Sequence, residues 1–293
     1  MLRKRKPTLG EVAVDRIARL VALCCLAATA ACTFLERLAL PTAELGDRHW
    51  AIADAASLET VDHGAWDTFL ATYVDTDPAG VNRVDYAAVA VDDRAALDAY
   101  LDLLQATPVS RLSRDEQLAF WVNLYNARTV ALILDHYPVD SIRDIRLRLF
   151  SFGPWEEPLM TVADRTLSLN DVEHRIIRPI WRDQRVHYVL SCAARGCPNL
   201  GLRAYTGESI DRAMDEAARA YVNDPRSVSF DGNGRLTVSK IYGWFREDFG
   251  GDHPGVLAEL RRHAAAPLRD RLEGRERVDA YAYDWSLNDT GAP

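Results

Sequence analysis

One stretch of this sequence predicts a long buried helix, and this helix constrains the fold more than any other segment. Residues 114–136 are apolar on nearly every side of a helical projection, which is typical of a helix enclosed by the rest of a domain. Ser113 stands at the expected N-cap and Glu116 follows three residues later, which is the pattern of a capping box. Pro138 ends the stretch, because proline does not continue a helix. The sequence therefore predicts a central helix around which other elements pack.

Shorter helices and strands are predicted on both sides of this helix. Apolar spacing predicts helices over 93–105 and 207–223. Turn residues predict β-hairpins within 158–169 and around 231–234. Hairpins pair their strands antiparallel. We therefore expect an α+β fold, in which helices and a largely antiparallel sheet surround the central helix.

The N-terminal residues have the composition of an export segment. Residues 3–6 are all basic, and 17–31 form an apolar run interrupted only by Arg19. This run is short for a membrane span and suits the apolar region of a signal sequence better. The sequence therefore predicts an exported bacterial protein, located in the periplasm or anchored to a membrane.

Two kinds of processing fit the end of this segment. Residues 28–30 fit ordinary signal cleavage, whereas 29–32 resemble a bacterial lipoprotein box ending at Cys32. We expect a lipid anchor on Cys32, followed by a tether over 33–62 and a domain that begins near His63. A cleaved soluble form, an uncleaved anchor and a buried first helix are the alternatives.

The charge distribution argues against a nucleic-acid partner. The net charge is −8, and the first 32 residues hold six basic and two acidic residues. The rest of the chain therefore has 29 basic and 41 acidic residues. Nucleic-acid binding requires clustered cations that neutralise phosphates. We expect no nucleic-acid partner, and contact with a membrane only through the N-terminal segment or its lipid.

Residues 167–198 contain more reactive side chains than any other stretch. The candidates are an adjacent acid and imidazole, a second imidazole and two thiols: Glu173, His174, His187, Cys192 and Cys197. A thiol reacts as its thiolate, and an imidazole or a helix N-terminus is needed to form the thiolate at neutral pH. The two histidines are the nearest imidazoles in sequence to the thiols.

The expected local structure limits which of these groups meet. Ser168 and Asp171 predict the start of a helix that Pro179 limits. Consecutive helical residues diverge by about 100°, so Glu173 is not expected to orient its neighbour His174. It either orients His187 or acts as the acid or base itself. Residues 186–190 predict a short strand that ends before the cysteines.

Several kinds of site remain open for this cluster. A cysteine hydrolase or acyltransferase would use Cys192 as nucleophile, His187 or His174 as base and Glu173 as the orienting or acid group. A structural disulfide between Cys192 and Cys197 is the main alternative. A metal site and a thiol redox pair are further alternatives, although the spacing is neither a short zinc knuckle nor Cys-x-x-Cys.

Two amides on the apolar helix need partners. Asn123 and Asn126 lie about one turn apart, and a buried amide without a hydrogen bond costs about 1–3 kcal/mol. They either hold neighbouring loops in place or, in the case of Asn123, orient a catalytic group or an oxyanion. Glycine-rich nucleotide motifs are missing from the sequence, and we expect no cofactor and no metal.

Five sequence motifs resemble the domain-of-unknown-function 547 family. In chain order they are AFWVNLYNARTVALILDHYP, LSLNDVEHRIIRP, RVHYVLSCAARGCPNLGLRAYT, VSKIYGWFREDFG and YDWSLND. The resemblance implies a single domain over 63–289, with Asn123, Asn126, the Glu-His pair, His187 and the cysteine loop as its characteristic residues. It also implies an exported N-terminus, and some relatives sit beside glutaredoxin-like domains. The activity of the family is unsettled.

Together these observations predict a cell-envelope protein with a thiol-centred site. The leading expectation is hydrolase or acyl-transfer chemistry at Cys192, with a fold distantly like cysteine proteases or transglutaminases. The alternative is a non-catalytic envelope lipoprotein that binds a ligand or partner and has a Cys192–Cys197 disulfide.

Overall fold

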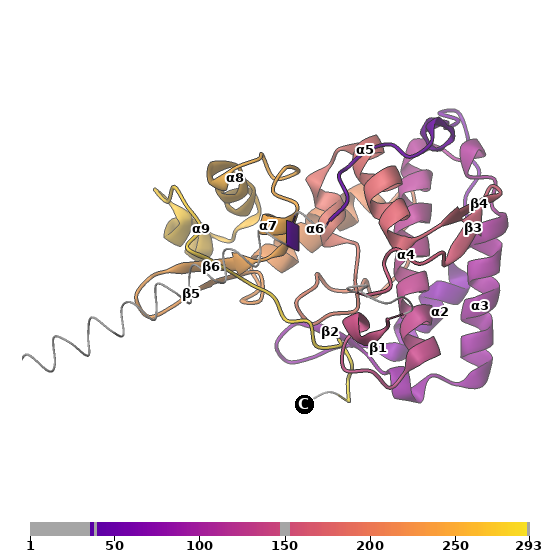
Figure 1. The fold of residues 1–293 in the computed structure, drawn as a ribbon, viewed down its shortest axis with the longest axis horizontal. Coiled ribbons are helices and arrows are strands. Elements are labelled where there is room, and N and C mark those ends of the chain that lie inside the picture. Colours follow the sequence, from indigo (N-terminus) through magenta and orange to yellow (C-terminus); the bar gives the residue numbers. More distant parts are fainter. Residues whose placement is uncertain (1–35, 38–39, 147–152, 292–293) are drawn as a thin grey trace, which may run out of the picture.

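A computed structural model describes residues 36–37, 40–146 and 153–291 (Figure 1). Cys32 and the export segment lie outside the described residues. The helices are α2 (Gly64–Tyr73), α3 (Val91–Ala106), α4 (Arg114–His136), α5 (Arg178–Trp181), α6 (Ile210–Val222), α7 (Ile241–Trp244), α8 (His253–His263) and α9 (Ala266–Leu272). Short 3₁₀ helices cover Arg48–Ala51, Tyr86–Ala88, Val109–Arg111, Ile142–Asp144 and Gln184–Tyr188, and Asp171–Ile177 is π-helical. In this described part, every helix is too short or too polar to cross a bilayer.

The predicted central helix is confirmed as α4. The Ser113 hydroxyl accepts a hydrogen bond from the Glu116 amide (3.4 Å), which caps the helix as expected. Phe120 and Trp121 are fully buried, and the ring of Trp50 meets Trp121 edge-on at 5.2 Å. Trp50 belongs to the expected tether, so part of that segment packs on the domain.

Two apolar cores lie side by side in the molecule. The larger surrounds α4 and receives side chains from α2 and α3. The smaller gathers Tyr188, Tyr221 and Tyr242 with residues of α8. Figure 1 shows α2–α5 on one side of the molecule, α7–α9 on the other and α6 between them, and α6 contributes side chains to both cores. The α+β fold class is confirmed by this mixture of helices and small sheets.

The strands form three small sheets instead of one large sheet. They are β1 (Val74–Thr76), β2 (Asn82–Val84), β3 (Met160–Val162), β4 (Arg165–Leu167), β5 (Val228–Phe230), β6 (Leu236–Ser239) and β7 (Ala280–Ala282). The predicted hairpins are confirmed as β3–β4 and β5–β6, which are antiparallel. The third strand, β7, pairs parallel with β6. The strand pairing is thus largely antiparallel, as expected, but it is divided among three small sheets.

The prediction that Pro179 ends its helix is wrong. The π-helical stretch continues through Pro179 into α5, and Arg182 ends it with a left-handed φ of 51°. Proline lacks an N–H, so it leaves carbonyls of the preceding turn without a helical partner. The amides of Glu44 and Gly46 supply those bonds, to the carbonyls of His174 and Arg175, each at 3.1 Å.

The prediction of a strand over 186–190 is also wrong. Gln184–Tyr188 forms a 3₁₀ helix, which begins where the Asp183 carboxylate accepts from the Arg185 amide (2.9 Å). Val186 and Tyr188 are buried on packed helices. A lone strand there would leave backbone groups without partners, whereas a helical turn satisfies them locally.

Candidate functional site

The loop that holds the two cysteines is clamped between α4 and the C-terminal segment. The buried Asn126 amide donates to the Val189 carbonyl and accepts from the Ser191 amide, both at 2.8 Å. On the other side, the Gly196 amide donates to the Asp284 carbonyl (2.8 Å). A Cβ at Gly196 would lie 2.7 Å from the Asp284 nitrogen, so only glycine fits. Both contacts fix the backbone on either side of Cys192.

The two sulfurs lie in direct contact. Cys192 Sγ is 2.7 Å from Cys197 Sγ and 3.1 Å from the Tyr283 hydroxyl. The backbone amide of Cys192 donates to Cys197 Sγ at 2.9 Å. Cys192 is partly exposed and Cys197 is buried, and both are free thiols. The structure therefore brings together the two cysteines of the predicted site and adds Tyr283.

The surroundings of the two thiols shift their pKa values in opposite directions. The hydrogen bond with Cys197 and then burial raise the pKa of Cys192 well above its ordinary value. Burial opposes ionisation of Cys197, but hydrogen bonds from Cys192 and Tyr283 lower its pKa. Burial and the nearby cysteines raise the pKa of Tyr283, which keeps its hydroxyl a donor. The pKa of Cys192 is thus raised and that of Cys197 lowered, so Cys197 loses its proton before Cys192 does.

Glu173 lies between the histidines and Tyr125. Its carboxylate oxygens are 3.9 Å from His174 Nδ1, 3.7 Å from His187 Nδ1 and 3.3 Å from the Tyr125 hydroxyl. Burial, then Glu173 and the cysteines, raise the pKa of Tyr125, so this phenol stays protonated and donates to Glu173. Glu173 therefore lies near both imidazoles, but neither distance is that of a hydrogen bond.

Both imidazoles form hydrogen bonds with charged side chains and not with the thiols. His187 Nε2 donates to Asp248 (2.7 Å), and its ring stacks on Phe245 with centroids 4.2 Å apart. Arg178 donates from Nε to Asp248 (2.6 Å) and from Nη1 to His174 Nδ1 (2.9 Å). Within the described residues, no hydrogen bond joins either imidazole to either sulfur. The structure thus separates the predicted base from the predicted nucleophile.

His174 is held neutral by its contact with Arg178. A guanidinium has only donors, so His174 Nδ1 must present its lone pair to Arg178. Burial, helped by the Arg178 charge and opposed by Glu173, lowers the pKa of His174 from 6.5 to about 4. A proton on Nδ1 would remove the acceptor and place two cations side by side.

Acid is expected to destabilise the fold through His174. An unfolded imidazole binds its proton near pH 6.5, whereas folded His174 does so near pH 4. The unfolded state therefore binds more protons between these values, so stability is complete above about pH 6.5 and falls as the pH drops toward 4. The shift corresponds to a loss of about 3 kcal/mol in the free energy of unfolding.

Urea unfolding at several pH values measures this effect. The His174→Gln variant keeps an acceptor for Arg178 but cannot titrate, so its free energy of unfolding should vary less over this window than that of the wild type. The His136→Gln variant, altered at the end of α4, serves as control and should match the wild-type dependence. Equal pH dependence in wild type and His174→Gln would contradict the assignment.

Asn123 is not brought to the cysteine pair. Its side chain donates to the Tyr205 carbonyl (2.7 Å) and accepts from the Tyr205 amide (3.0 Å). Its remaining polar contact among the described residues is with the His63 ring, at 3.3 Å and 3.4 Å. The geometry matches the loop-holding role for Asn123.

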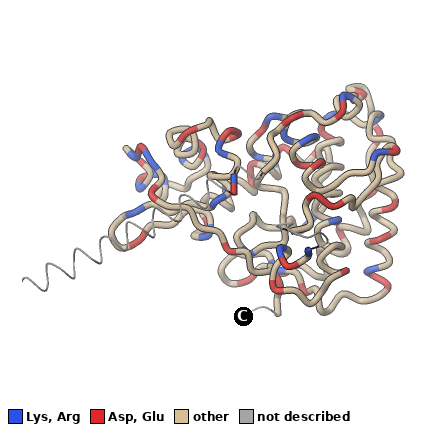
Figure 2. Tube along the Cα trace, viewed as in Figure 1, with Lys and Arg blue, Asp and Glu red and all other residues tan. Residues whose placement is uncertain are grey.

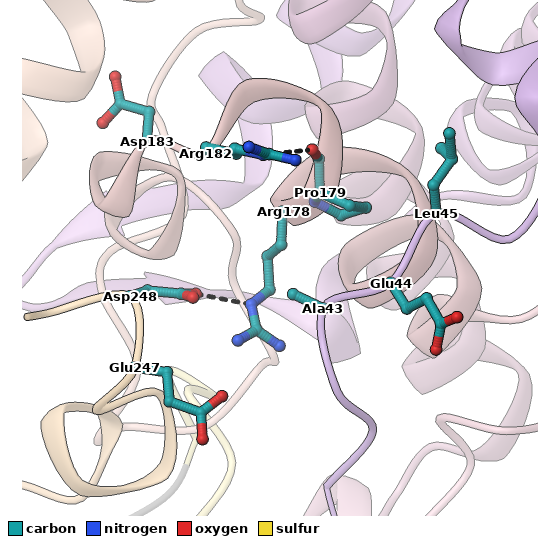
Figure 3. Close-up of a pocket in the computed structure, with 9 residues that line it drawn as sticks. All are labelled: Ala43, Glu44, Leu45, Arg178, Pro179, Arg182, Asp183, Glu247 and Asp248. Atoms are coloured by element: carbon teal, nitrogen blue, oxygen red, sulfur yellow. Dashed lines mark hydrogen bonds and ion pairs between the residues drawn. The ribbon is translucent and has the colours of Figure 1, made fainter. Parts of the chain in front are cut away.

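A pocket of about 570 Å³ lies next to the charged cluster. Its wall is made by residues 43–45, Arg178, Pro179, Arg182, Asp183, Glu247 and Asp248. Figure 3 shows the Arg178 side chain reaching across this space to Asp248. Asp248 therefore connects the pocket with His187.

Sequence reasoning missed Arg178, Asp248, Tyr125 and Tyr283. Arg178 was detectable, because it follows His174 by four residues on one helix and therefore faces the same side. Asp248 and Tyr283 are 61 and 91 residues from their partners His187 and Cys192, and no local pattern marks them. The four groups expected for a metal alternative, two histidines and two cysteines, form no ligand cluster in the described part of the chain.

Comparison with known proteins finds a family model that matches the central part of the chain. No curated protein and no solved structure matches significantly, so the expected distant likeness to cysteine proteases or transglutaminases stays a prediction. The family model described as "Protein of unknown function, DUF547" matches residues 109–222. That range holds α4, Glu173, His174, His187 and both cysteines, and the match supports the domain family expected from the sequence motifs.

Proposed function

We propose that this protein is an envelope-anchored thiol protein whose Cys192 and Cys197 exchange two electrons with the disulfide of another protein. The observation that carries the proposal is the 2.7 Å contact between the two sulfurs. A disulfide requires sulfurs about 2.05 Å apart, so a small rotation of the side chains closes the bond. The thiol-centred site expected from the sequence is retained, with exchange rather than acyl transfer as its chemistry.

Proton transfer between the two sulfurs supplies a nucleophile at the partly exposed Cys192. In molecules in which Cys197 is ionised, the Cys192 proton moves to Cys197 as a partner disulfide approaches, and the Cys192 thiolate attacks one partner sulfur. A mixed disulfide forms and the first partner thiolate leaves, taking the proton from Cys197. The Cys197 thiolate then attacks Cys192 Sγ and releases the second partner thiolate. The pair is oxidised to a disulfide, and the partner is reduced by the same two electrons.

Acyl transfer is supported less well by this geometry. It needs a base within hydrogen-bond reach of the thiol, whereas His187 Nε2 is bonded to Asp248 and His174 Nδ1 to Arg178. Glu173 accepts from the Tyr125 hydroxyl at 3.3 Å, and in the described part of the chain no hydrogen bond joins its carboxylate to either sulfur. A hydrolase would also need one thiol, whereas exchange needs both.

Alkylation in redox buffers tests the proposal. The full chain is equilibrated in mixtures of reduced and oxidised dithiothreitol, and free thiols are then counted by mass after acid quenching and alkylation. Cys192 and Cys197 are expected to oxidise and be reduced together, as one two-electron couple. A pair that stays fully reduced over the whole range contradicts exchange, and a bond that stays closed in the folded protein supports the structural disulfide instead.

Lipid attachment at Cys32 is a separate prediction. The basic start, the apolar run 17–31 and the small residues before Cys32 support it. The Cys32→Ala variant is expected to lose most membrane association, because a lipid chain contributes about 0.8 kcal/mol for each buried CH₂. Membrane fractionation after expression in a bacterium measures this, with Cys25→Ala as the matched control. Unchanged association of Cys32→Ala would point to an uncleaved anchor.

A further inference from the structure

Four partly exposed aromatic side chains form one continuous cluster, which we call the aromatic face: Trp155, Trp244, Tyr283 and Trp285. The ring centroids of Tyr283 lie 4.8 Å from Trp244 and 4.7 Å from Trp285, and Trp155 is 5.7 Å from Trp285. The Tyr283 hydroxyl also forms a hydrogen bond with Cys192 Sγ at 3.1 Å. The aromatic face is therefore continuous with the cysteine pair.

The N-terminal end of the described chain is attached to this same cluster. The Glu36 carboxylate accepts from Lys240 Nζ at 2.8 Å with each oxygen, and from Trp244 Nε1 at 2.9 Å. Cys32 precedes Glu36 by four residues. A chain spans at most about 3.6 Å per residue, so the two Cα atoms lie within about 14 Å of each other. A membrane that holds Cys32, or the apolar run before it, must therefore lie close to Trp244.

We propose that the aromatic face rests in the interfacial layer of the membrane to which the chain is anchored. This proposal rests on the anchoring proposed above. Tryptophan and tyrosine rings are enriched in this layer. Here the polar groups of Trp244 and Tyr283 are already bonded to Glu36 and Cys192, so the accessible parts of the rings offer mainly apolar surface. The short connection from Glu36 to the anchor brings this face, rather than the surface of α3 or α9, toward the lipid.

Two cationic side chains lie at the aromatic face, and only one of them is paired with a carboxylate among the described residues. Lys240 is neutralised by Glu36, and its Nζ lies 6.0 Å from the Trp244 ring. Arg143 lies over Trp285 at 5.1 Å and has no ion pair among the described residues. Elsewhere, acidic and basic residues are interspersed (Figure 2). Attachment should therefore depend mainly on the aromatic rings, with a smaller contribution from Arg143 where the lipid is anionic. It would place the cysteine pair near the membrane surface.

Fluorescence quenching by brominated lipid tests this contact. The full chain is reconstituted in phosphatidylcholine vesicles with brominated acyl chains, and its tryptophan emission is compared with that in unbrominated vesicles. The first 35 residues contain no tryptophan, so all quenching reports on the rest of the chain. The double variant Trp244→Phe with Trp285→Phe is expected to lose at least about half of the quenching, because these rings reach the interface.

A matched variant and a flotation assay separate the outcomes. Trp181→Phe removes a partly buried tryptophan outside the aromatic face and should leave the quenching close to that of the wild type. Vesicle flotation is measured on the same samples. Protein that floats but shows no quenching, or equal quenching in the double variant, overturns the membrane contact while leaving the anchor intact. Protein that does not float overturns the anchor and the contact together, and thiol exchange, measured by alkylation, stands or falls independently.

Discussion

Replacing Cys197 by serine is expected to leave Cys192 trapped in a mixed disulfide with its partner. The wild-type pair resolves that intermediate with a sulfur held 2.7 Å away. Groups held in contact react with effective concentrations far above the millimolar thiols of a redox buffer, so release of the partner should slow by about 10³-fold or more. Non-reducing gels and mass spectrometry after mixing with a model disulfide protein measure the accumulated adduct.

The reciprocal change distinguishes the roles of the two sulfurs. Cys192→Ser removes the partly exposed thiol and leaves only the buried Cys197, so it is expected to form little adduct at any time. Serine is close to cysteine in size, and both variants should unfold cooperatively in urea. Equal adduct from the two variants would contradict the assignment of Cys192 as the attacking sulfur. A Cys197→Ser variant that still reduces the model disulfide protein at the wild-type rate would show that Cys197 is not needed, and this would favour acyl transfer over exchange.

Replacing Asp248 by asparagine is expected to lower the free energy of unfolding by about 3 kcal/mol, because removing one partner of a buried charge pair leaves the other uncompensated. The Arg178 side chain is only 5% exposed, and Asp248 is its partner at 2.6 Å. The same carboxylate accepts from His187. Asparagine keeps the shape of the side chain and removes the charge.

The neighbouring residue provides a matched control for Asp248. Glu247 pairs with Arg37, but its side chain is 66% exposed, so Glu247→Gln should change the stability by less than about 1 kcal/mol. Urea unfolding at pH 7 compares the two variants with the wild type. Equal losses in both variants would show that Asp248 is no more important than a surface ion pair.

The effect of Asp248 should also depend on pH. Although burial acts in the opposite direction, hydrogen bonds from His187 and Arg178 hold the pKa of Asp248 well below its ordinary value. A lowered carboxyl pKa contributes stability that is complete above the unfolded pKa and is lost as the pH falls through the folded value. The difference in the free energy of unfolding between the wild type and Asp248→Asn should therefore be constant above about pH 4 and become smaller below it.

Elements defined by neighbouring residues could be predicted from the sequence. The capping box of α4, its apolar surface and the hairpins β3–β4 and β5–β6 all depend on contacts within a few residues. The prediction of a strand over 186–190 was wrong because a short, mainly apolar stretch is equally compatible with a buried helical turn. The prediction that Pro179 ends its helix was wrong for a related reason. The helical carbonyls left free by the proline accept hydrogen bonds from the amides of Glu44 and Gly46, more than 130 residues earlier.

The sequence by itself determined the central helix, the α+β class and the stretch where the reactive groups gather. Only the tertiary structure decided which of those groups meet. In it, Cys192 Sγ contacts the Tyr283 hydroxyl, and His187 donates a hydrogen bond to Asp248. The physical reason is distance along the chain: apolar periodicity and capping are local, whereas the pairing of a buried charge or thiol is set by how whole helices pack around α4.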